Sequence, residues 1–114
     1  MHEFGIVQEM IRSSERELKA SGAEGRVVEI RLVVGRLSGA STEALRMAFD
    51  ILKPGTRFAD AELVMDQPMA RATCIECGAT SEVDELFAPC ASCRSCRVAI
   101  EGGRELLLSA IEVE

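Results

Sequence analysis

The sequence contains no tryptophan and no tyrosine, and only four phenylalanines among its 114 residues. Proteins that bind single strands of nucleic acid stack the bases on aromatic side chains, so this composition argues against such a function. Positive charge is also scarce, because 13 Lys and Arg residues stand against 19 Asp and Glu residues, a formal net charge of −6 at pH 7. A nucleic-acid-binding surface needs the opposite balance. We therefore expect no nucleic-acid partner.

Long apolar runs are missing as well. A membrane-spanning helix needs about 20 consecutive apolar residues, and no run in this sequence approaches that length. We therefore expect no membrane partner. The chain opens without a signal peptide, and its five cysteines are odd in number, which disfavours a disulfide framework. These features favour a cytoplasmic protein with reduced cysteines.

Histidine is almost absent, since His2 is the only one. A Ser/His/Asp or Cys/His catalytic set would therefore need a residue at the chain terminus. No glycine-rich phosphate-binding loop is present, and neighbouring acids such as Asp84 and Glu85 are interpreted as a solvated surface. The sequence predicts no catalytic residue, and we expect a protein that is not an enzyme.

All five cysteines lie between Cys74 and Cys96. The pairs Cys74/Cys77 and Cys90/Cys93 are two C-x-x-C motifs, and this pattern is typical of a tetrahedral four-thiolate zinc site. Four thiolates fill the coordination sphere of zinc, so the predicted site is structural. Gly78 directly follows the first pair, where it suits the tight turn of a zinc knuckle.

The fifth cysteine leaves the second pair ambiguous. Cys93 and Cys96 form another C-x-x-C motif, so the second pair could be Cys90/Cys93 or Cys93/Cys96, and spacing alone does not decide. An alternative to zinc is a redox dithiol at Cys93/Cys96. That hypothesis predicts zinc release and disulfide formation under mild oxidant.

The N-terminal tripeptide Met1-His2-Glu3 offers a second set of metal donors. A residue as large as His2 should block removal of the initiator Met, so the free α-amine would belong to Met1. That amine, the amide nitrogen of His2 and its imidazole can close fused chelate rings around one ion. The Glu3 amide nitrogen can complete a planar four-nitrogen set, which suits Ni(II) or Cu(II). The simpler alternative is that His2 is an ordinary residue of a frayed terminus.

Apolar residues recur at helical spacing in two segments, 4–20 and the stretch between Ser41 and Pro54. Ser21-Gly22 is a plausible stop for the first helix, and Ser41 is the expected N-cap of the second. The apolar residues of the first segment, expected to be mainly core, are Phe4, Val7, Met10, Ile11 and Leu18.

Three segments are predicted to be strands: 26–35, 61–69 and 104–113. The last is too apolar to lie loose, so we expect it to pair with the earlier strands. The predicted fold is α+β, with two helices packed on a small three-stranded sheet and an inserted zinc-ribbon-like lobe. The expected domains are 1–70 completed by 104–114, which would hold nickel, and 71–103, which would hold zinc.

Several short segments coincide in one order along the chain. They are Met1-His2-Glu3, VVGRLSG at 33–39, EALRMAF at 43–49, Gly55-Thr56, AEL at 61–63, the two cysteine pairs, GREL at 103–106 and Ile111-Glu112. Taken together, they make the sequence similar to the HypA/HybF family of hydrogenase maturation factors, which are nickel metallochaperones. The resemblance covers essentially the whole chain.

The resemblance implies a function and partners. It implies a protein that binds Ni(II) at its N-terminus through His2 and carries a structural zinc in a separate lobe. The Met1 α-amine and Glu3 are the further nickel donors expected from the chelate chemistry of the tripeptide. Nickel would pass to the precursor of the [NiFe]-hydrogenase large subunit with the help of the GTPase HypB. Some members also serve urease, so urease maturation factors are further candidate partners. We expect a monomer or a weak homodimer.

The resemblance also implies a zinc ligand set. The family's spacing from its last zinc cysteine to the Gly-x-Glu-Leu element matches that from Cys93 to Gly103. By this resemblance the ligands are Cys74, Cys77, Cys90 and Cys93, and Cys96 is an extra thiol that could exchange with Cys90. The alternative function is a zinc-ribbon protein-interaction module with an inert N-terminus, which would hold zinc and ignore stoichiometric nickel.

Overall fold

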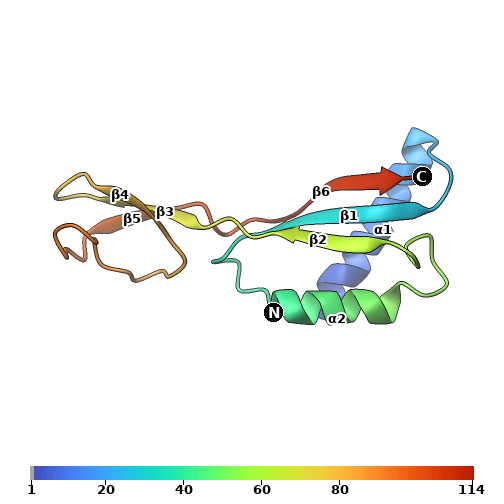
Figure 1. Ribbon diagram of the computed structural model, residues 1–114, viewed down its shortest axis with the longest axis horizontal. Helices are drawn as coiled ribbons and strands as arrows, with labels where there is room; N and C mark the ends of the chain where they lie inside the picture. The colour runs from blue at the N-terminus through green and yellow to red at the C-terminus, as the bar shows by residue number, and fades with distance from the viewer. Residues whose placement is uncertain (1) are drawn as a thin grey trace. The chain divides into compact units, whose positions relative to one another are not determined.

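The computed structural model describes residues 2–114 (Figure 1). The elements follow in the order α1 (Glu3–Ser21), β1 (Val27–Val34), α2 (Thr42–Leu52), β2 (Glu62–Asp66), β3 (Ala70–Cys74), β4 (Thr80–Val83), β5 (Val98–Glu101) and β6 (Leu106–Val113). They form two compact units. The helical unit comprises the chain through Leu32 with segments 40–65 and 107–114, and the cysteine unit comprises 33–39 and 66–106. Among the described residues, neither helix is long and apolar enough to cross a membrane.

The helical unit contains a three-stranded sheet in the order β2-β1-β6, with α1 and α2 in contact (Figure 1). The C-terminal strand lies beside β1, so the prediction that it returns to the earlier strands is confirmed. The predicted α+β fold, with two helices on a small sheet and a zinc-ribbon-like lobe, is confirmed as well.

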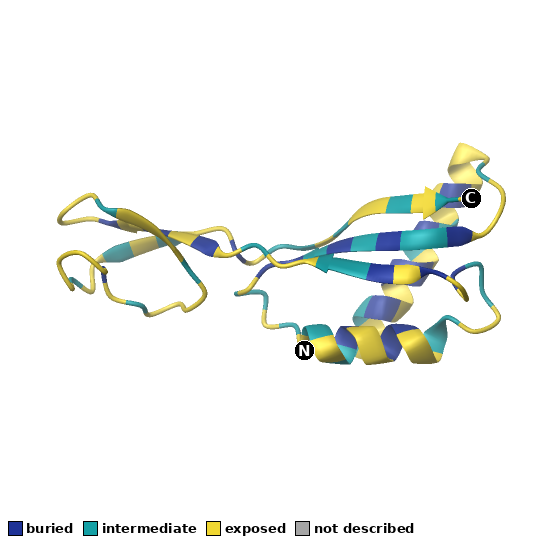
Figure 2. Ribbon diagram, viewed as in Figure 1, coloured by how far each residue is buried: buried dark blue, intermediate teal, exposed yellow. Residues whose placement is uncertain are grey.

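The core of the helical unit follows the sequence periodicity. Residues of α1 at helical spacing are buried, and in β1 burial alternates from Ile30 onward, while Val27 is buried out of phase (Figure 2). Phe4 departs from this expectation, because 47% of it is exposed. It lies in the first turn of α1. Phe58, between α2 and β2, is fully buried although no periodic pattern marks it.

The helix ends are capped as predicted. At the end of α1, Gly22 adopts a left-handed φ of 73°, and its N–H bonds to the carbonyls of Leu18 and Lys19. At the start of α2, the Ser41 hydroxyl accepts a hydrogen bond from the Ala44 amide at 3.1 Å. These caps fix where α1 ends and where α2 begins.

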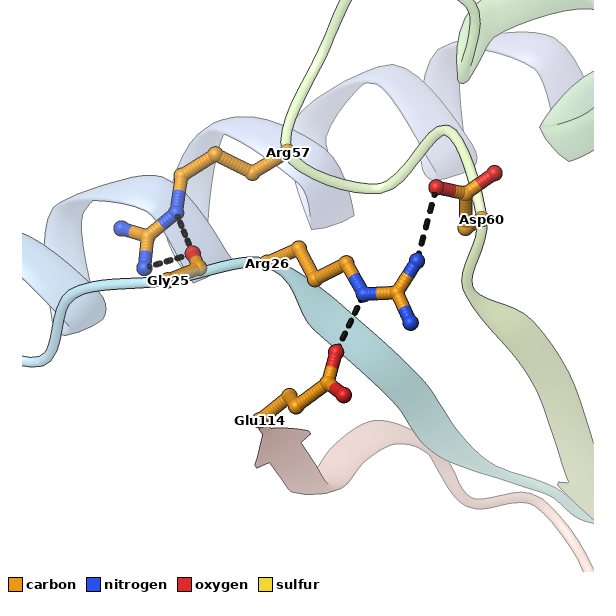
Figure 3. A network of polar contacts seen from close by, with 5 residues as sticks. All are labelled: Gly25, Arg26, Arg57, Asp60 and Glu114. Atoms are coloured by element: carbon orange, nitrogen blue, oxygen red, sulfur yellow. Dashed lines mark hydrogen bonds and ion pairs between the residues drawn. The ribbon is translucent and has the colours of Figure 1, made fainter.

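An arginine network joins the ends of several segments of the helical unit (Figure 3). The Arg26 guanidinium pairs with the carboxylate of Asp60 at 3.2 Å and with that of Glu114. Arg57 donates to the carbonyls of Gly25, at 2.7 and 2.9 Å, and Ala23, at 3.1 Å. The last residue of the chain is thereby tied to the start of β1.

The cysteine unit has its own antiparallel sheet in the order β4-β3-β5 (Figure 1). The expected strand 61–69 proves too long, since β2 ends at Asp66 and β3 begins at Ala70. Pro68 lies between them and has no N–H to donate to a sheet. Strands β4 and β5 were not predicted, because each has only four residues, too few for a clear alternation.

Three segments cross closely within the cysteine unit. Gly35 and Leu37 donate their amides to the carbonyls of Glu105 and Gly103, and the Arg36 amide donates to Pro68. A Cβ on Gly35 would lie 2.2 Å from the Gly103 carbonyl oxygen. Neither a β-carbon nor its hydrogens fit in that space, so the crossing requires glycine at position 35.

Candidate metal centres

The first cysteine pair forms a tight knuckle at the end of β3. The Gly78 amide donates to the Cys74 carbonyl at 2.9 Å, which closes the turn. The Cys77 amide lies 3.5 Å from the Cys74 sulfur, and Gly78 has a left-handed φ of 77°. The backbone thus turns Cys74 and Cys77 toward the same point, as the sequence pattern predicts.

The second knuckle repeats this geometry at Cys90 and Cys93. The Arg94 amide donates to the Cys90 carbonyl at 2.9 Å, and the Cys93 amide lies 3.5 Å from the Cys90 sulfur. Arg94 has a φ of 63° and is the single non-glycine residue with positive φ among residues 2–114. Such a conformation costs about 1–2 kcal/mol for an L-residue. The turn is therefore retained here without the glycine that eases it in the first knuckle.

The two knuckles bring four sulfur atoms together. Those of Cys74, Cys77, Cys90 and Cys93 all lie within 4.8 Å of one another. The Cys74–Cys93 and Cys77–Cys90 sulfur pairs are each 3.6 Å apart. Tetrahedral zinc, with Zn–S bonds of about 2.3 Å, separates its sulfurs by roughly 3.8 Å. The donor set therefore fits zinc in type, number and spacing.

Cys96 is exposed and lies outside the group of four. A second hydrogen bond supports the turn between Cys90 and Arg94, because the Cys90 amide donates to the Ser95 carbonyl at 2.9 Å. The structure thus forms a knuckle from Cys90 and Cys93, the pair that spacing alone did not select. None of the five cysteines is in a disulfide.

Backbone amides favour the thiolate at the first cysteine of each knuckle. The Cys93 amide, followed by that of Ser92, lowers the pKa of Cys90 to about 6. The Cys77 amide is likewise the main cause of a lowered pKa at Cys74. These two sulfurs are poised to ionise and bind a cation.

The second cysteine of each knuckle behaves oppositely. The Ser95 amide favours the Cys93 thiolate, but the sulfurs of Cys74 and its neighbours outweigh it and raise the pKa of Cys93 to about 12. The Ala79 amide favours the Cys77 thiolate, but the Cys90 sulfur, burial and the Cys74 sulfur together raise the pKa of Cys77. Four adjacent thiolates repel one another, so full ionisation of this cluster requires a cation.

The second candidate centre is the start of α1. Met1, whose α-amine is a predicted nickel donor, lies outside the described residues. His2 is the N-cap of α1, and its carbonyl accepts the first helical hydrogen bond, from the Ile6 amide at 3.1 Å. The first amides of a helix have no acceptor within the helix. The Glu3 amide could therefore bind a metal without breaking a helical hydrogen bond.

Glu3 makes a contact that the sequence did not indicate. Its carboxylate accepts a hydrogen bond from the backbone amide of Ser41 at 2.9 Å. This bond, with a smaller contribution from the Glu3 amide itself, lowers the pKa of the Glu3 carboxyl. No sequence signal joins two residues that are 38 positions apart.

A shallow hollow of about 340 Å³ opens beside these residues. Its lining is His2, Glu3, Phe4, Ala44, Met47, Ala48 and Ile51. Phe4, Met47 and Ile51 are all substantially exposed. Among residues 2–114, His2 and Glu3 belong to no ready-made cluster of three or more His, Cys, Asp or Glu side chains. A metal bound here would therefore depend largely on backbone donors.

Comparison with known proteins gives one consistent result. The family model HypA, described as hydrogenase/urease nickel incorporation metallochaperone, matches residues 1–113. The hydrogenase maturation factor HypA of Chlorobaculum tepidum is 37% identical over the full length of both chains. That of Aquifex aeolicus is 35% identical, over all of this chain and 98% of its own. The solution structure of the Ni metallochaperone HypA from Helicobacter pylori, 23% identical, has the same fold, with a TM-score of 0.65 over 99% of this chain and 97% of its own.

Proposed function

The chain belongs to the HypA family of hydrogenase/urease nickel-incorporation metallochaperones, and we propose on this basis that it binds Ni(II) at its N-terminus and delivers it to the [NiFe]-hydrogenase large-subunit precursor. The observation that carries the proposal is the family match over residues 1–113. The placement of the only histidine at position 2 supports it.

The proposed nickel ligands are the Met1 α-amine, His2 and the amide of Glu3. All of these nitrogens must be free of the proton that competes with the metal. Nickel affinity should therefore fall as the pH is lowered. Ligands from adjacent residues can be released one at a time, which suits transfer to a partner better than storage. Cu(II) should bind at least as tightly, so selectivity must come from partners and metal supply.

The proposed zinc ligands are Cys74, Cys77, Cys90 and Cys93. Zinc bound there would cross-link the two knuckles, and the proposal gives it no catalytic role. The backbone turns hold the four sulfurs at the required spacing. We assign nickel to the domain predicted as 1–70 with 104–114, and zinc to that predicted as 71–103, although residues 33–39, 66–70 and 104–106 belong to the cysteine unit.

The partners follow from the family role. We propose that the protein works in the cytoplasm with the HypB GTPase and the large-subunit precursor, and that urease maturation factors are further candidates. Its relatives carry the names of maturation factors and metallochaperones, and we infer that it is not an enzyme.

The decisive experiment is a nickel titration of zinc-loaded, tag-free protein beside a copy with one glycine added before Met1. The extension moves the free amine away from His2. One nickel bound by the native chain, with most of the affinity lost in the extended copy, supports the proposed chelate. Equal binding by both would show that the amine is not a ligand.

The companion variant is His2→Ala, which should abolish nickel binding while one zinc and the fold are retained. Full nickel affinity in this variant would overturn the nickel site. Protein that holds zinc but binds no nickel in any form would instead support the zinc-ribbon interaction module.

A further inference from the structure

We propose that the Glu3 carboxylate is a positioning residue that fastens the N-terminal nickel ligands to the start of α2. This inference rests on the proposed function. It is carried by one contact, in which the Ser41 amide donates to Glu3 Oε2 at 2.9 Å. The bond joins the first residue of α1 to the N-cap of α2, and we call it the latch.

Ser41 is a firm anchor for the latch. Its hydroxyl accepts from the Ala44 amide at 3.1 Å, and its carbonyl accepts from the Leu45 amide at 2.9 Å. Ser41 therefore uses both of its acceptors to begin α2, and its amide is the donor that faces Glu3. The helix behind it is held in the core by the buried side chains of Leu45 and Phe49.

The latch restricts the conformations of Glu3, the residue whose amide would bind nickel. Glu3 supplies both the carboxylate in the latch and the amide that would bind nickel, and His2 is its direct neighbour. With the Glu3 side chain held by Ser41, fewer backbone orientations are available to both residues, which would hold His2 at the hollow lined by Met47 and Ile51. A site ordered before binding loses less conformational entropy when the metal arrives. The latch should therefore raise nickel affinity.

The sharpest test compares Ser41→Pro with Ser41→Ala. Both variants lose the hydroxyl that caps α2, but only proline also loses the amide N–H that Glu3 accepts. Ser41 has a φ of −83°, close to the value of about −65° that proline requires. We expect Ser41→Pro to bind nickel roughly three- to tenfold more weakly than Ser41→Ala. Neither variant changes the charge near the metal, so the difference reports on the hydrogen bond.

Glu3 variants provide the second arm of the test. Glu3→Ala should lower nickel affinity, and Glu3→Gln, whose amide oxygen can still accept from Ser41, should restore part of it. Glu3→Ala combined with Ser41→Pro should be no weaker than the weaker single variant, because one bond can be lost only once. Glu9→Ala is the matched control, since Glu9 on the same helix contacts Ser13 and Arg16, and its nickel affinity should stay within about twofold of wild type.

A nickel-free measurement separates this inference from the function on which it rests. Loss of the latch should let the first turn of α1 fray, so the Ile6 and Val7 amides should exchange hydrogen faster in Ser41→Pro and Glu3→Ala than in Ser41→Ala. If wild type binds no nickel but the three variants show this exchange pattern, the nickel function fails and the latch stands. If Ser41→Pro and Ser41→Ala agree in both exchange and nickel affinity, the latch is refuted.

Discussion

At the scale of single residues, the two knuckles differ at one position. Gly78 and Arg94 both follow the second cysteine of a pair and both have positive φ, of 77° and 63°. A residue with a β-carbon is strained there, and glycine is not. The same turn is therefore made once by glycine, without strain, and once by arginine, with the strain of a positive φ.

This comparison predicts that substitutions at the two positions change the stability of the cysteine unit in opposite directions. Arg94→Gly should stabilise the cysteine unit by about 0.5–1 kcal/mol, the relief of strain less the added flexibility of glycine. Gly78→Ala should destabilise it by about 1–2 kcal/mol. Denaturant unfolding of zinc-loaded protein, followed by zinc release, measures both. A loss of stability in Arg94→Gly would show that the arginine side chain contributes more than its backbone costs.

Sequence spacing predicted the candidate ligands at both centres but not the tertiary contacts around them. The four clustered cysteines and His2 were named from local patterns, because a knuckle and a chelate are built from near neighbours. The Glu3–Ser41 bond spans 38 positions, and the exposure of Phe4 depends on how α1 meets α2. Contacts of that kind arise from tertiary packing, which no local pattern records.

At the scale of elements, the sheet of the cysteine unit is stabilised by few buried apolar side chains. The buried side chains of β3 are Ala70, Ala72 and Cys74, all small. Figure 2 shows mainly exposed and intermediate residues along β4 and β5. Such a sheet gains little from burial and needs a cross-link. The same shortage of apolar alternation explains why β4 and β5 were not predicted.

Removal of zinc should therefore unfold this sheet selectively. We expect a strong chelator to abolish hydrogen-exchange protection in β3, β4 and β5 while the far-UV signal of α1 and α2 persists. The control is protein treated with chelator and excess zinc. Retention of the β3–β4 pairing in zinc-free protein would contradict the prediction.

Acid should have the same effect as the chelator. The pKa of Cys90 is lowered from an ordinary value of 9.0 to about 6. A lowered pKa means that the thiolate stabilises the folded unit fully above the ordinary value and loses that contribution as pH falls through the folded value. Protons compete with zinc for all four sulfurs, so zinc should be retained at pH 7.5 and released progressively on acidification, as a chromogenic zinc indicator would show.

At the scale of the whole molecule, the helical unit has a conventional core that requires no metal. Phe49, Phe58, Ile30 and Leu45 are all at most 1% exposed. The return of β6 to this unit was predicted correctly, although none of its residues is fully buried and Leu107 is 49% exposed. Phe58 was missed, since it lies between elements where no periodicity applies.

This arrangement predicts that the core and the zinc site respond to different changes. Phe58→Ala should destabilise the helical unit by about 3–5 kcal/mol, the usual cost of a cavity of that size. Its zinc content at 25 °C should remain one per chain, because no cysteine contacts are altered. Thermal unfolding followed by circular dichroism, together with zinc analysis, checks both parts, and loss of zinc from folded Phe58→Ala would contradict the separation.

The crossing of Gly35 with Gly103 also bears on protein engineering. The segment 33–39 belongs to the cysteine unit although it precedes α2 in the chain. A fragment of residues 66–106 would leave that segment behind, together with the amides of Gly35, Arg36 and Leu37 that pair with Glu105, Pro68 and Gly103. The cysteine unit therefore cannot be moved to another protein as one continuous segment. Grafting it onto another scaffold would require two separate pieces of chain.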